Sequence, residues 1–282
     1  MNVATCSHIA CKNSSRTHLA LNLDKFKQHL SDSIAEALNA TSDLLVVPQV
    51  EIQQNISAPN DEQLQVINSK LPRPVEPGEL TVVTWVASHN LLSHSMEVWD
   101  LDSLQAMAKG FPQGLGCPLQ RDHDWYTVEM NEGFIFDSRL TRSSAAPDEI
   151  VNAEPGFSEH NLKIIGRDGY VSLELDTAIP TESPFLKAIM HGKISQCSTG
   201  GMRTDALYCP LCSESQGKPV DFFKDDSCPH IPPLPYMSWW YDFDDPEIRK
   251  LLAPYYIRGG FTTAIELSAV VKGDLPGAQL KR

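Results

Sequence analysis

Short runs of β-branched and aromatic residues recur between residues 80 and 271, and they constrain the fold more than any other feature of the chain. Such residues favour extended backbone, and runs of this length predict strands. An Arg167-Asp168-Gly169 turn between two of the runs predicts a hairpin. Many short strands with few helices predict a mainly β fold with flanking helices (α+β), arranged as a β-barrel or a strongly curved sheet. The runs cover residues 80–88, 134–140, 162–166, 170–176, 194–197 and 261–271.

Three short helices are expected beside these strands. The first has Asp102 as its N-cap and ends at Gly110. The second has Ser183 as its N-cap, before a proline at the first helical position, and ends at Gly192. The third begins at Asp245, which also precedes a proline.

Residues 1–78 differ from the rest and are expected to form an N-terminal extension. Apolar residues at steps of three and four predict an amphipathic helix over residues 24–40. Residues 53–78 are polar and end in LPRPVEPG, which predicts an exposed, proline-rich linker. Residues 79–282 then form the main domain, with an insertion at 205–235.

Charge and hydropathy exclude several classes of function. The chain has 23 Lys and Arg residues against 36 Asp and Glu, and its formal charge of −13 repels phosphate backbones. No run approaches the roughly 18 apolar residues of a membrane span, and the first residues lack the apolar stretch of a secretory signal. We therefore expect a soluble intracellular protein that binds neither nucleic acid nor membranes.

Four potential metal ligands lie within 22 residues of one another in the 205–235 insertion. Cys209 and Cys212 form one pair, and Cys228 and His230 form a second pair after an interval of fifteen residues. Three thiolates and an imidazole make a closed tetrahedral Zn²⁺ site, which is typical of structural zinc. The odd total of seven cysteines also argues against a disulfide framework. A looser group, which we expect to be unstructured with metal binding as a lesser alternative, consists of Cys6, His8, Cys11 and His18.

Three further segments could bring a serine nucleophile together with its partners. His123 lies between two aspartates in a polar loop, and taken alone it would be a solvated histidine. Ser198 precedes Thr199-Gly200-Gly201, whose glycines either end a strand or let backbone amides approach a developing oxyanion. In the last strand Glu266 and Ser268 share one face, and a carboxylate on an inner face needs a partner such as His123.

The order of these segments resembles the prohead (capsid maturation) proteases of tailed bacteriophages. That family typically has a His-Asp pair, then a serine in a helix, glycine, strand, Ser-x-Gly context, and then a Glu-x-Ser-Leu-Val strand before a Pro-Ala turn. Here the motifs read His123-Asp124, Gly192 to Gly200 around Ser198, and Glu266-Leu267-Ser268-Ala269-Val270 before Pro276-Gly277-Ala278. The resemblance covers roughly residues 80–280.

Two departures from the family pattern are visible. Thr199-Gly200-Gly201-Met202 stands where an apolar residue, a glycine and an aromatic residue are usual, which puts the oxyanion geometry in doubt. The late turn has Pro-Gly-Ala in place of Pro-Ala.

The resemblance implies a β-barrel wrapped by helices, similar to the herpesvirus assembly proteases, with the zinc knuckle as an insertion. It implies a serine endopeptidase that cleaves capsid and scaffold precursors inside the immature phage head, in the host cytoplasm. By position, Ser198 is then the nucleophile, His123 the base and Glu266 the third member, with no catalytic cofactor. Removal of its own extension and a homo-oligomeric state are open possibilities.

Two other functions fit parts of the sequence. A metal-dependent hydrolase could use His123 with Asp122 or Asp124 to activate water, although Ser198 would then have no role. A non-catalytic capsid-assembly protein of the same fold is the second alternative, and the altered residues after Ser198 keep it open.

Overall fold

A computed structural model describes residues 56–121, 123, 131–204, 206–234, 237, 241–270 and 274–281. The helix expected over residues 24–40 and the N-terminal Cys/His group lie outside these residues. No described helix is both long and apolar enough to cross a membrane.

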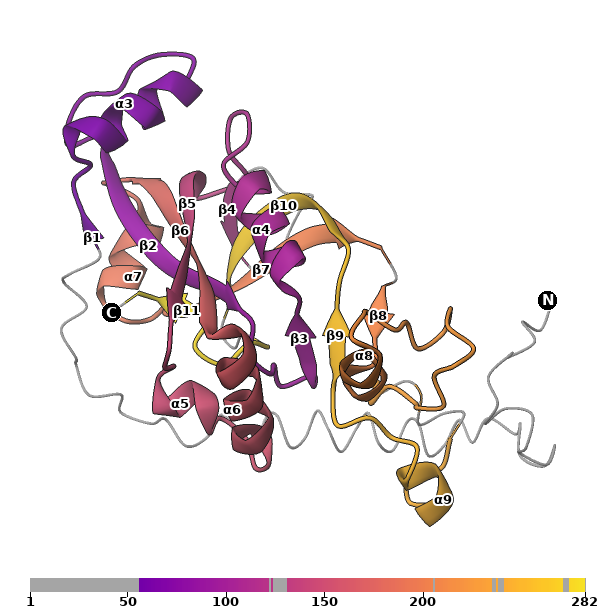
Figure 1. The fold of residues 1–282 in the computed structure, drawn as a ribbon. Coiled ribbons are helices and arrows are strands. Elements are labelled where there is room, and N and C mark those ends of the chain that lie inside the picture. Colours follow the sequence, from indigo (N-terminus) through magenta and orange to yellow (C-terminus); the bar gives the residue numbers. More distant parts are fainter. Residues whose placement is uncertain are drawn as a thin grey trace, which may run out of the picture. The chain divides into compact units, whose positions relative to one another are not determined.

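Eight strands form the main sheet, in the order β1-β2-β11-β7-β10-β4-β5-β6 (Figure 1). Because β2 also pairs with β6, the hydrogen-bonded pairs run from β2 through β11 to β6 and back to β2. Only two residues of β11 join these pairs, so the sheet is curved and the expected closed β-barrel is not formed. The strands are β1 Ile56–Ser57, β2 Leu80–His89, β4 Pro118–Arg121, β5 Gly133–Ser143, β6 Tyr170–Pro180, β7 Gln196–Arg203, β10 Phe261–Val270 and β11 Gln279–Leu280.

A second sheet and seven helices complete the described residues, which makes the architecture mixed, with more sheet than helix. The second sheet has the order β3-β9-β8, with β3 Glu97–Trp99, β8 Leu207–Tyr208 and β9 Tyr256–Arg258. The helices are α3 Asp61–Lys70, α4 Leu101–Gly110, α5 Asp148–Val151, α6 Phe157–Asp168, α7 Pro184–Met190, α8 Pro210–Gln216 and α9 Pro246–Arg249.

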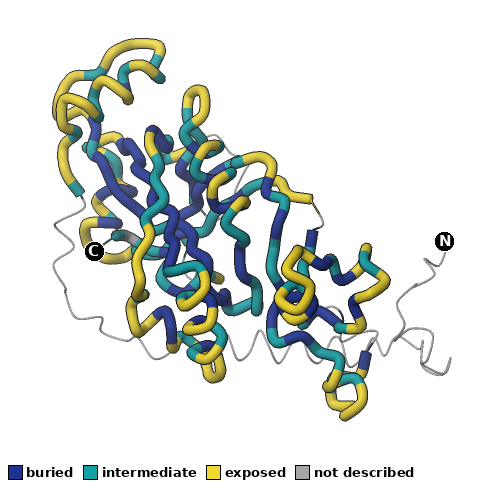
Figure 2. The backbone as a smooth tube through the Cα atoms, viewed as in Figure 1, coloured by how far each residue is buried: buried dark blue, intermediate teal, exposed yellow. Residues whose placement is uncertain are grey.

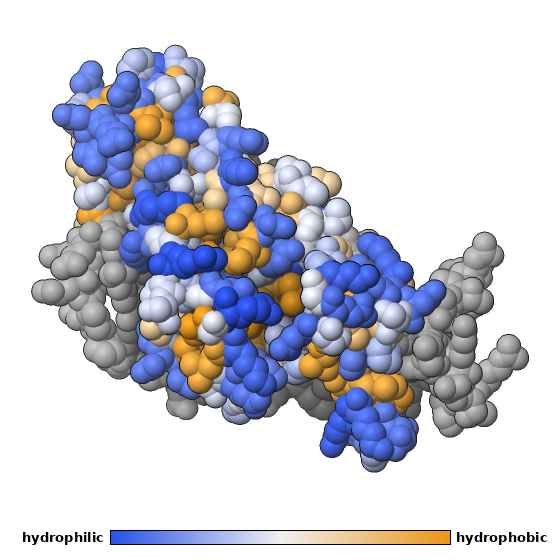
Figure 3. Space-filling view, viewed as in Figure 1, coloured by the Kyte–Doolittle hydropathy of each residue, from blue (hydrophilic) through white to orange (hydrophobic). Residues whose placement is uncertain are grey.

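The core follows the strands of the main sheet, where Figure 2 shows the buried backbone. Strand alternation supplies most of it, since Leu173 and Leu175 of β6 and Leu267 of β10 are fully buried in one cluster. Helix α4 packs closely on β10, because a Cβ on Gly110 would lie 3.1 Å from the Cβ of Ala264. On the face shown in Figure 3, hydrophilic side chains dominate and hydrophobic patches are smaller.

The expected strand over residues 162–166 and the hairpin that follows it are wrong, because these residues belong to α6. Phe157, Asn161 and Ile164 follow one another at steps of four and three, and all are buried. Gly169 ends the helix with a positive φ of 75°, and its N–H donates to Ile165 O (2.8 Å). The residues expected to form a hairpin turn therefore form a helix C-terminus.

Other boundaries agree with the sequence more closely. The N-cap of α4 is Asp100 and not Asp102, since Asp100 Oδ1 accepts from Ser103 N–H (2.7 Å). Ser183 and Asp245 cap α7 and α9 as expected. The expected strand over 194–197 begins at Gln196 instead.

The described part of the expected linker over residues 53–78 contains β1 and α3, whereas residues 71–78 are irregular and mostly exposed as expected. Asn60 and Gln63 form a reciprocal capping box, with N···O distances of 3.0 and 2.8 Å. Ile67 is fully buried in a cluster that includes Val82 and Phe136. The folded region therefore begins before residue 79.

If α3 belongs to the folded core, Ile67→Ala should lower the free energy of unfolding by about 2–5 kcal/mol, through lost burial and a cavity. The neighbouring Val66 is 36% exposed, so Val66→Ala is a matched control with a much smaller expected effect. Urea unfolding of both variants measures the difference. Equal values would mean that α3 contributes nothing to the core.

Candidate functional site

The candidate active site lies on one face of β7 and β10, which are neighbours in the main sheet. Glu266 pairs with Gly200, and Ser268 pairs with Ser198, in antiparallel register. Residues directly opposite one another in such a pair point to the same side of the sheet. Leu267, between the two polar residues of β10, faces the hydrophobic core instead. Ser198, Glu266 and Ser268 therefore share a face.

His123 reaches this face from the loop after β4, which pairs with β10 on the opposite side from β7. Its φ of 57° lies in the left-handed region that residues other than glycine rarely adopt. Its Nδ1 lies 2.6 Å from Oε1 of Glu266. The His123 side chain is 40% exposed, whereas that of Glu266 is fully buried. The pairing of Glu266 with His123 that the sequence predicts is therefore present.

This contact determines which ring nitrogen of His123 can act as a base. A carboxylate only accepts hydrogen bonds, so Nδ1 carries the proton and donates a hydrogen bond to Glu266. In the neutral ring Nε2 is then the basic nitrogen. The arrangement suits a histidine that takes a proton from a neighbouring hydroxyl.

Ser268 connects the two partners, a role that could not be predicted from its sequence context. Its hydroxyl donates to Oε2 of Glu266. It also accepts from the backbone N–H of His123 (3.0 Å). Ser268 is fully buried, so a substrate cannot reach its oxygen. Its sequence signals were its position two residues after Glu266, on the same strand face, and its match to the serine of the Glu-x-Ser-Leu-Val motif.

Ser198 is the accessible serine of the pair. It is partly exposed, and its register with Ser268 places the two Cβ atoms about 4.5–5.5 Å apart. Its hydroxyl makes no hydrogen bond to another described residue. Ser198 therefore lies on the strand next to Ser268, whose hydroxyl oxygen accepts from the backbone N–H of His123.

The two glycines after Ser198 have steric roles that the sequence did not predict. A Cβ on Gly200 would lie 1.9 Å from Oε1 of Glu266, so glycine here makes room for the carboxylate. A Cβ on Gly201 would lie 2.4 Å from the ring of Phe261. These glycines therefore let β10 side chains lie against β7.

The direction of the backbone along β7 determines which of its N–H groups could donate to the oxyanion of a reaction intermediate. The N–H of Cys197 donates to Ala278 O (3.0 Å), on the β11 side of β7. Because N–H groups alternate between the two sides of a strand, that of Thr199 points to the same side. The N–H groups of Ser198 and Gly200 then point toward β10.

Cys117 is a neighbouring thiol that could be mistaken for a nucleophile. Burial, followed by the charge of Glu266, raises its pKa to about 11. It is therefore a neutral thiol near pH 7, and a thiol is a poor nucleophile compared with a thiolate.

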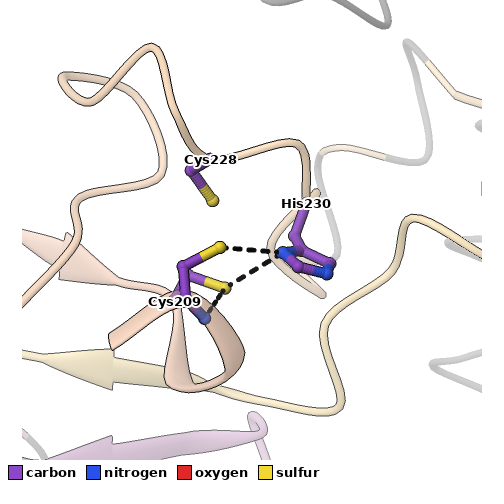
Figure 4. A group of neighbouring side chains, drawn as sticks. Cys209, Cys228 and His230 are labelled. Carbon is purple, nitrogen blue, oxygen red and sulfur yellow. Dashed lines mark hydrogen bonds between the residues drawn. The ribbon is translucent and has the colours of Figure 1, made fainter. Parts of the chain in front are cut away.

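A candidate metal centre lies in the insertion, where Cys209, Cys212, Cys228 and His230 come together. Their ligand atoms all lie within 4.8 Å of one another, and the three cysteines are buried. Nδ1 of His230 is 3.4 Å from Cys209 Sγ and 3.2 Å from Cys212 Sγ. Figure 4 shows the labelled side chains pointing toward one another. These four residues could bind one metal ion.

The local backbone positions the cysteines of this cluster. Cys209 directly follows β8 and is the N-cap of α8, with Cys212 N–H donating to its sulfur (3.5 Å). Burial raises the pKa of Cys228 to about 12, although the backbone N–H of His230 hydrogen-bonds its sulfur. Burial also lowers the pKa of His230. Cys209 and Cys212 are thus held by a strand end and a helix N-terminus, whereas Cys228 and His230 lie outside helices and strands.

Of the other proposed metal ligands, only His123 is among the described residues. Asp122 and Asp124 are not among the described residues, and neither is the N-terminal group at Cys6, His8, Cys11 and His18. Within the described part of the chain, His123 belongs to no group of three or more close Cys, His, Asp or Glu ligands.

No protein-family model, curated protein or solved structure matches this chain.

Proposed function

We propose that the protein is a serine endopeptidase with Ser198 as nucleophile, His123 as general base and Glu266 as the third member. The observation that carries the proposal is the fully buried Glu266 carboxylate, which is hydrogen-bonded to the half-exposed His123 and lies on the same face of the sheet as Ser198. A buried charge is costly unless it is paired, and pairing with an accessible imidazole is typical of nucleophile activation. A solvated loop histidine would need no such partner.

In the proposed reaction, Ser198 Oγ attacks the scissile carbonyl carbon and His123 Nε2 takes the hydroxyl proton. Glu266 keeps the ring oriented through Nδ1–H and stabilises the imidazolium that forms. His123 then gives the proton to the leaving amine, which separates from an acyl-enzyme on Ser198. A water molecule, deprotonated by His123, attacks the ester and restores the free hydroxyl.

Among the three residues expected to support the oxyanion, Thr199 is favoured by its backbone direction. Its N–H points away from β10, whereas that of Gly200 points into the β10 pairing. Preorganised backbone donors stabilise charge that develops on the carbonyl oxygen. Gly200 contributes by admitting the Glu266 carboxylate, and Gly201 by admitting Phe261.

For the substrate, we propose capsid and scaffold precursor proteins, processed inside an immature phage head. This rests on the resemblance of the His123, Ser198 and Glu266 segments to prohead proteases. The circular order of strand pairs supports a fold related to the herpesvirus-protease barrel. A non-catalytic assembly protein is the alternative if the triad does not react.

The direct test is covalent labelling of the full chain with a fluorophosphonate active-serine probe, followed by peptide mapping. We expect modification of Ser198 alone. His123→Ala should abolish labelling because it removes the base, and Glu266→Gln should slow it less because the base remains and loses only the carboxylate that orients it and stabilises its charged form.

Labelling that survives in His123→Ala would contradict the proposed base. If Glu266→Gln reacts like the wild type, a different carboxylate is the third member, and Asp124 would be tested first. An unlabelled wild-type chain would favour the non-catalytic assembly protein.

For the metal centre, we propose one structural zinc ion. Soft sulfur donors with one imidazole favour zinc, and four protein ligands leave no open position for substrate. With Zn–S near 2.3 Å and Zn–N near 2.0–2.1 Å, a tetrahedral site has S···N separations of roughly 3.5 Å. The S···N distances of 3.2 and 3.4 Å are close to that value.

A further inference from the structure

We propose that Ser268 is a positioning residue, which holds the His123 loop and the Glu266 carboxylate in their reactive arrangement. This inference rests on the proposed peptidase site and adds a fourth side chain to it. Ser268 reaches both partners through one oxygen atom, since its hydroxyl donates to Glu266 and accepts from the His123 backbone.

Ser268 first fixes the orientation of the Glu266 carboxylate. Oε1 of Glu266 contacts His123 and Oε2 contacts Ser268, so each oxygen has its own donor. The side chain is fully buried, and a buried acceptor that loses its donor is destabilised because water cannot replace it. Gly200 leaves space for the carboxylate from the other side. Ser268 therefore orients the acid that orients His123.

Ser268 also holds the loop that carries the base, His123. His123 stands two residues beyond the end of β4, with left-handed backbone that is unfavourable without support. Its N–H bond to Ser268 ties that backbone to β10 at the residue paired with Ser198. A displacement of about 1 Å in such a group can cost roughly 100-fold in rate. The anchor thus sets the distance between base and nucleophile.

The same atoms explain why Ser268 is not itself the nucleophile. Its hydroxyl proton is directed to Glu266, its lone pair accepts from the backbone, and its side chain is fully buried. Substrate reaches the partly exposed Ser198 instead. One serine of this cross-strand pair reacts, and the other holds the reacting group in place.

The test compares Ser268→Ala and Ser268→Cys with Ser172→Ala in the full chain. Ser172 is a matched control, because it is also a buried strand serine and its hydroxyl hydrogen-bonds Thr141 and Tyr170, neither of which belongs to the site. The cysteine variant keeps the side-chain size with a much weaker donor, and it serves where alanine does not fold. The first readout is the low-field proton NMR resonance of His123 Nδ1–H, which needs no activity.

We expect the Nδ1–H resonance to be lost or strongly shifted in both Ser268 variants and retained in Ser172→Ala. Where cleavage is measurable, kcat should fall about 100-fold with little change in KM, because the reacting geometry changes and not substrate binding. A wild-type resonance in a folded Ser268 variant would overturn the proposal. A lost resonance supports it even if the chain never reacts with a serine probe, so the two proposals can fail separately.

Discussion

Ser198→Ala should reduce cleavage of a co-expressed capsid or scaffold precursor roughly a millionfold, the loss typical of a missing nucleophile. Without Oγ no acyl-enzyme can form, and the remaining oxyanion donors supply little rate by themselves. The fold should persist, because the lost hydroxyl makes no hydrogen bond to another described residue. Precursor masses and thermal unfolding, measured on the same protein, separate lost chemistry from lost structure.

Ser195→Ala is the matched control, since this serine lies three residues earlier, just before β7 begins. It should cleave like the wild type. Undiminished turnover by Ser198→Ala would end the serine-peptidase hypothesis. If the wild-type chain cleaves no precursor and reacts with no serine probe, the non-catalytic assembly protein becomes the better explanation.

Removal of the metal should have the second largest effect, on stability. The purified chain should contain one zinc ion, and Cys209→Ser should contain none. A ligand present at a thousandfold excess over its Kd stabilises the folded state by about 4 kcal/mol. At about 2–4 °C per kcal/mol for a domain of this size, the variant should melt roughly 8–16 °C lower. Metal analysis beside thermal unfolding measures both.

Cys117→Ser is the control for this experiment, because Cys117 lies outside the metal cluster. It should keep the zinc. A wild-type chain without zinc would contradict the site. A folded, zinc-free Cys209→Ser protein that has lost all turnover would instead favour the metal-hydrolase alternative, because a structural ion leaves the chemistry intact while the fold holds.

The long strands could be predicted from sequence because their runs of β-branched and aromatic residues are long. Leu80–His89 and Phe261–Val270 span ten residues each, and each lies where the pattern placed it. The run over residues 162–166 is much shorter, and so short a run fits a strand or one helical turn equally well. What decides it is the burial of Phe157 and Asn161 upstream, together with a glycine that ends a helix.

In the two candidate sites, contacts between residues close in the sequence could be predicted more easily than contacts between distant segments. Each metal-ligand pair lies within four residues along the chain, so spacing alone predicts the cluster. The Glu266–His123 contact required the resemblance as well as strand alternation. The role of Gly200 could not be predicted, because the carboxylate that needs its space comes from another strand. Likewise, Ser268 acquires its role only when the His123 loop folds over it.

The pairing of β7 on its two sides has a consequence for local opening. On one side it lies along the length of β10, and on the other it meets β11 only at Gln279. Short pairings open at lower free energy than long ones, so amide protons near Gln279 should exchange with solvent well before those between β7 and β10. The strand that carries Ser198 should therefore stay paired with β10 while its short pairing with β11 opens. We expect opening of the β11 pairing to leave the contact between Glu266 and His123 intact, because that contact lies on the β10 side of β7.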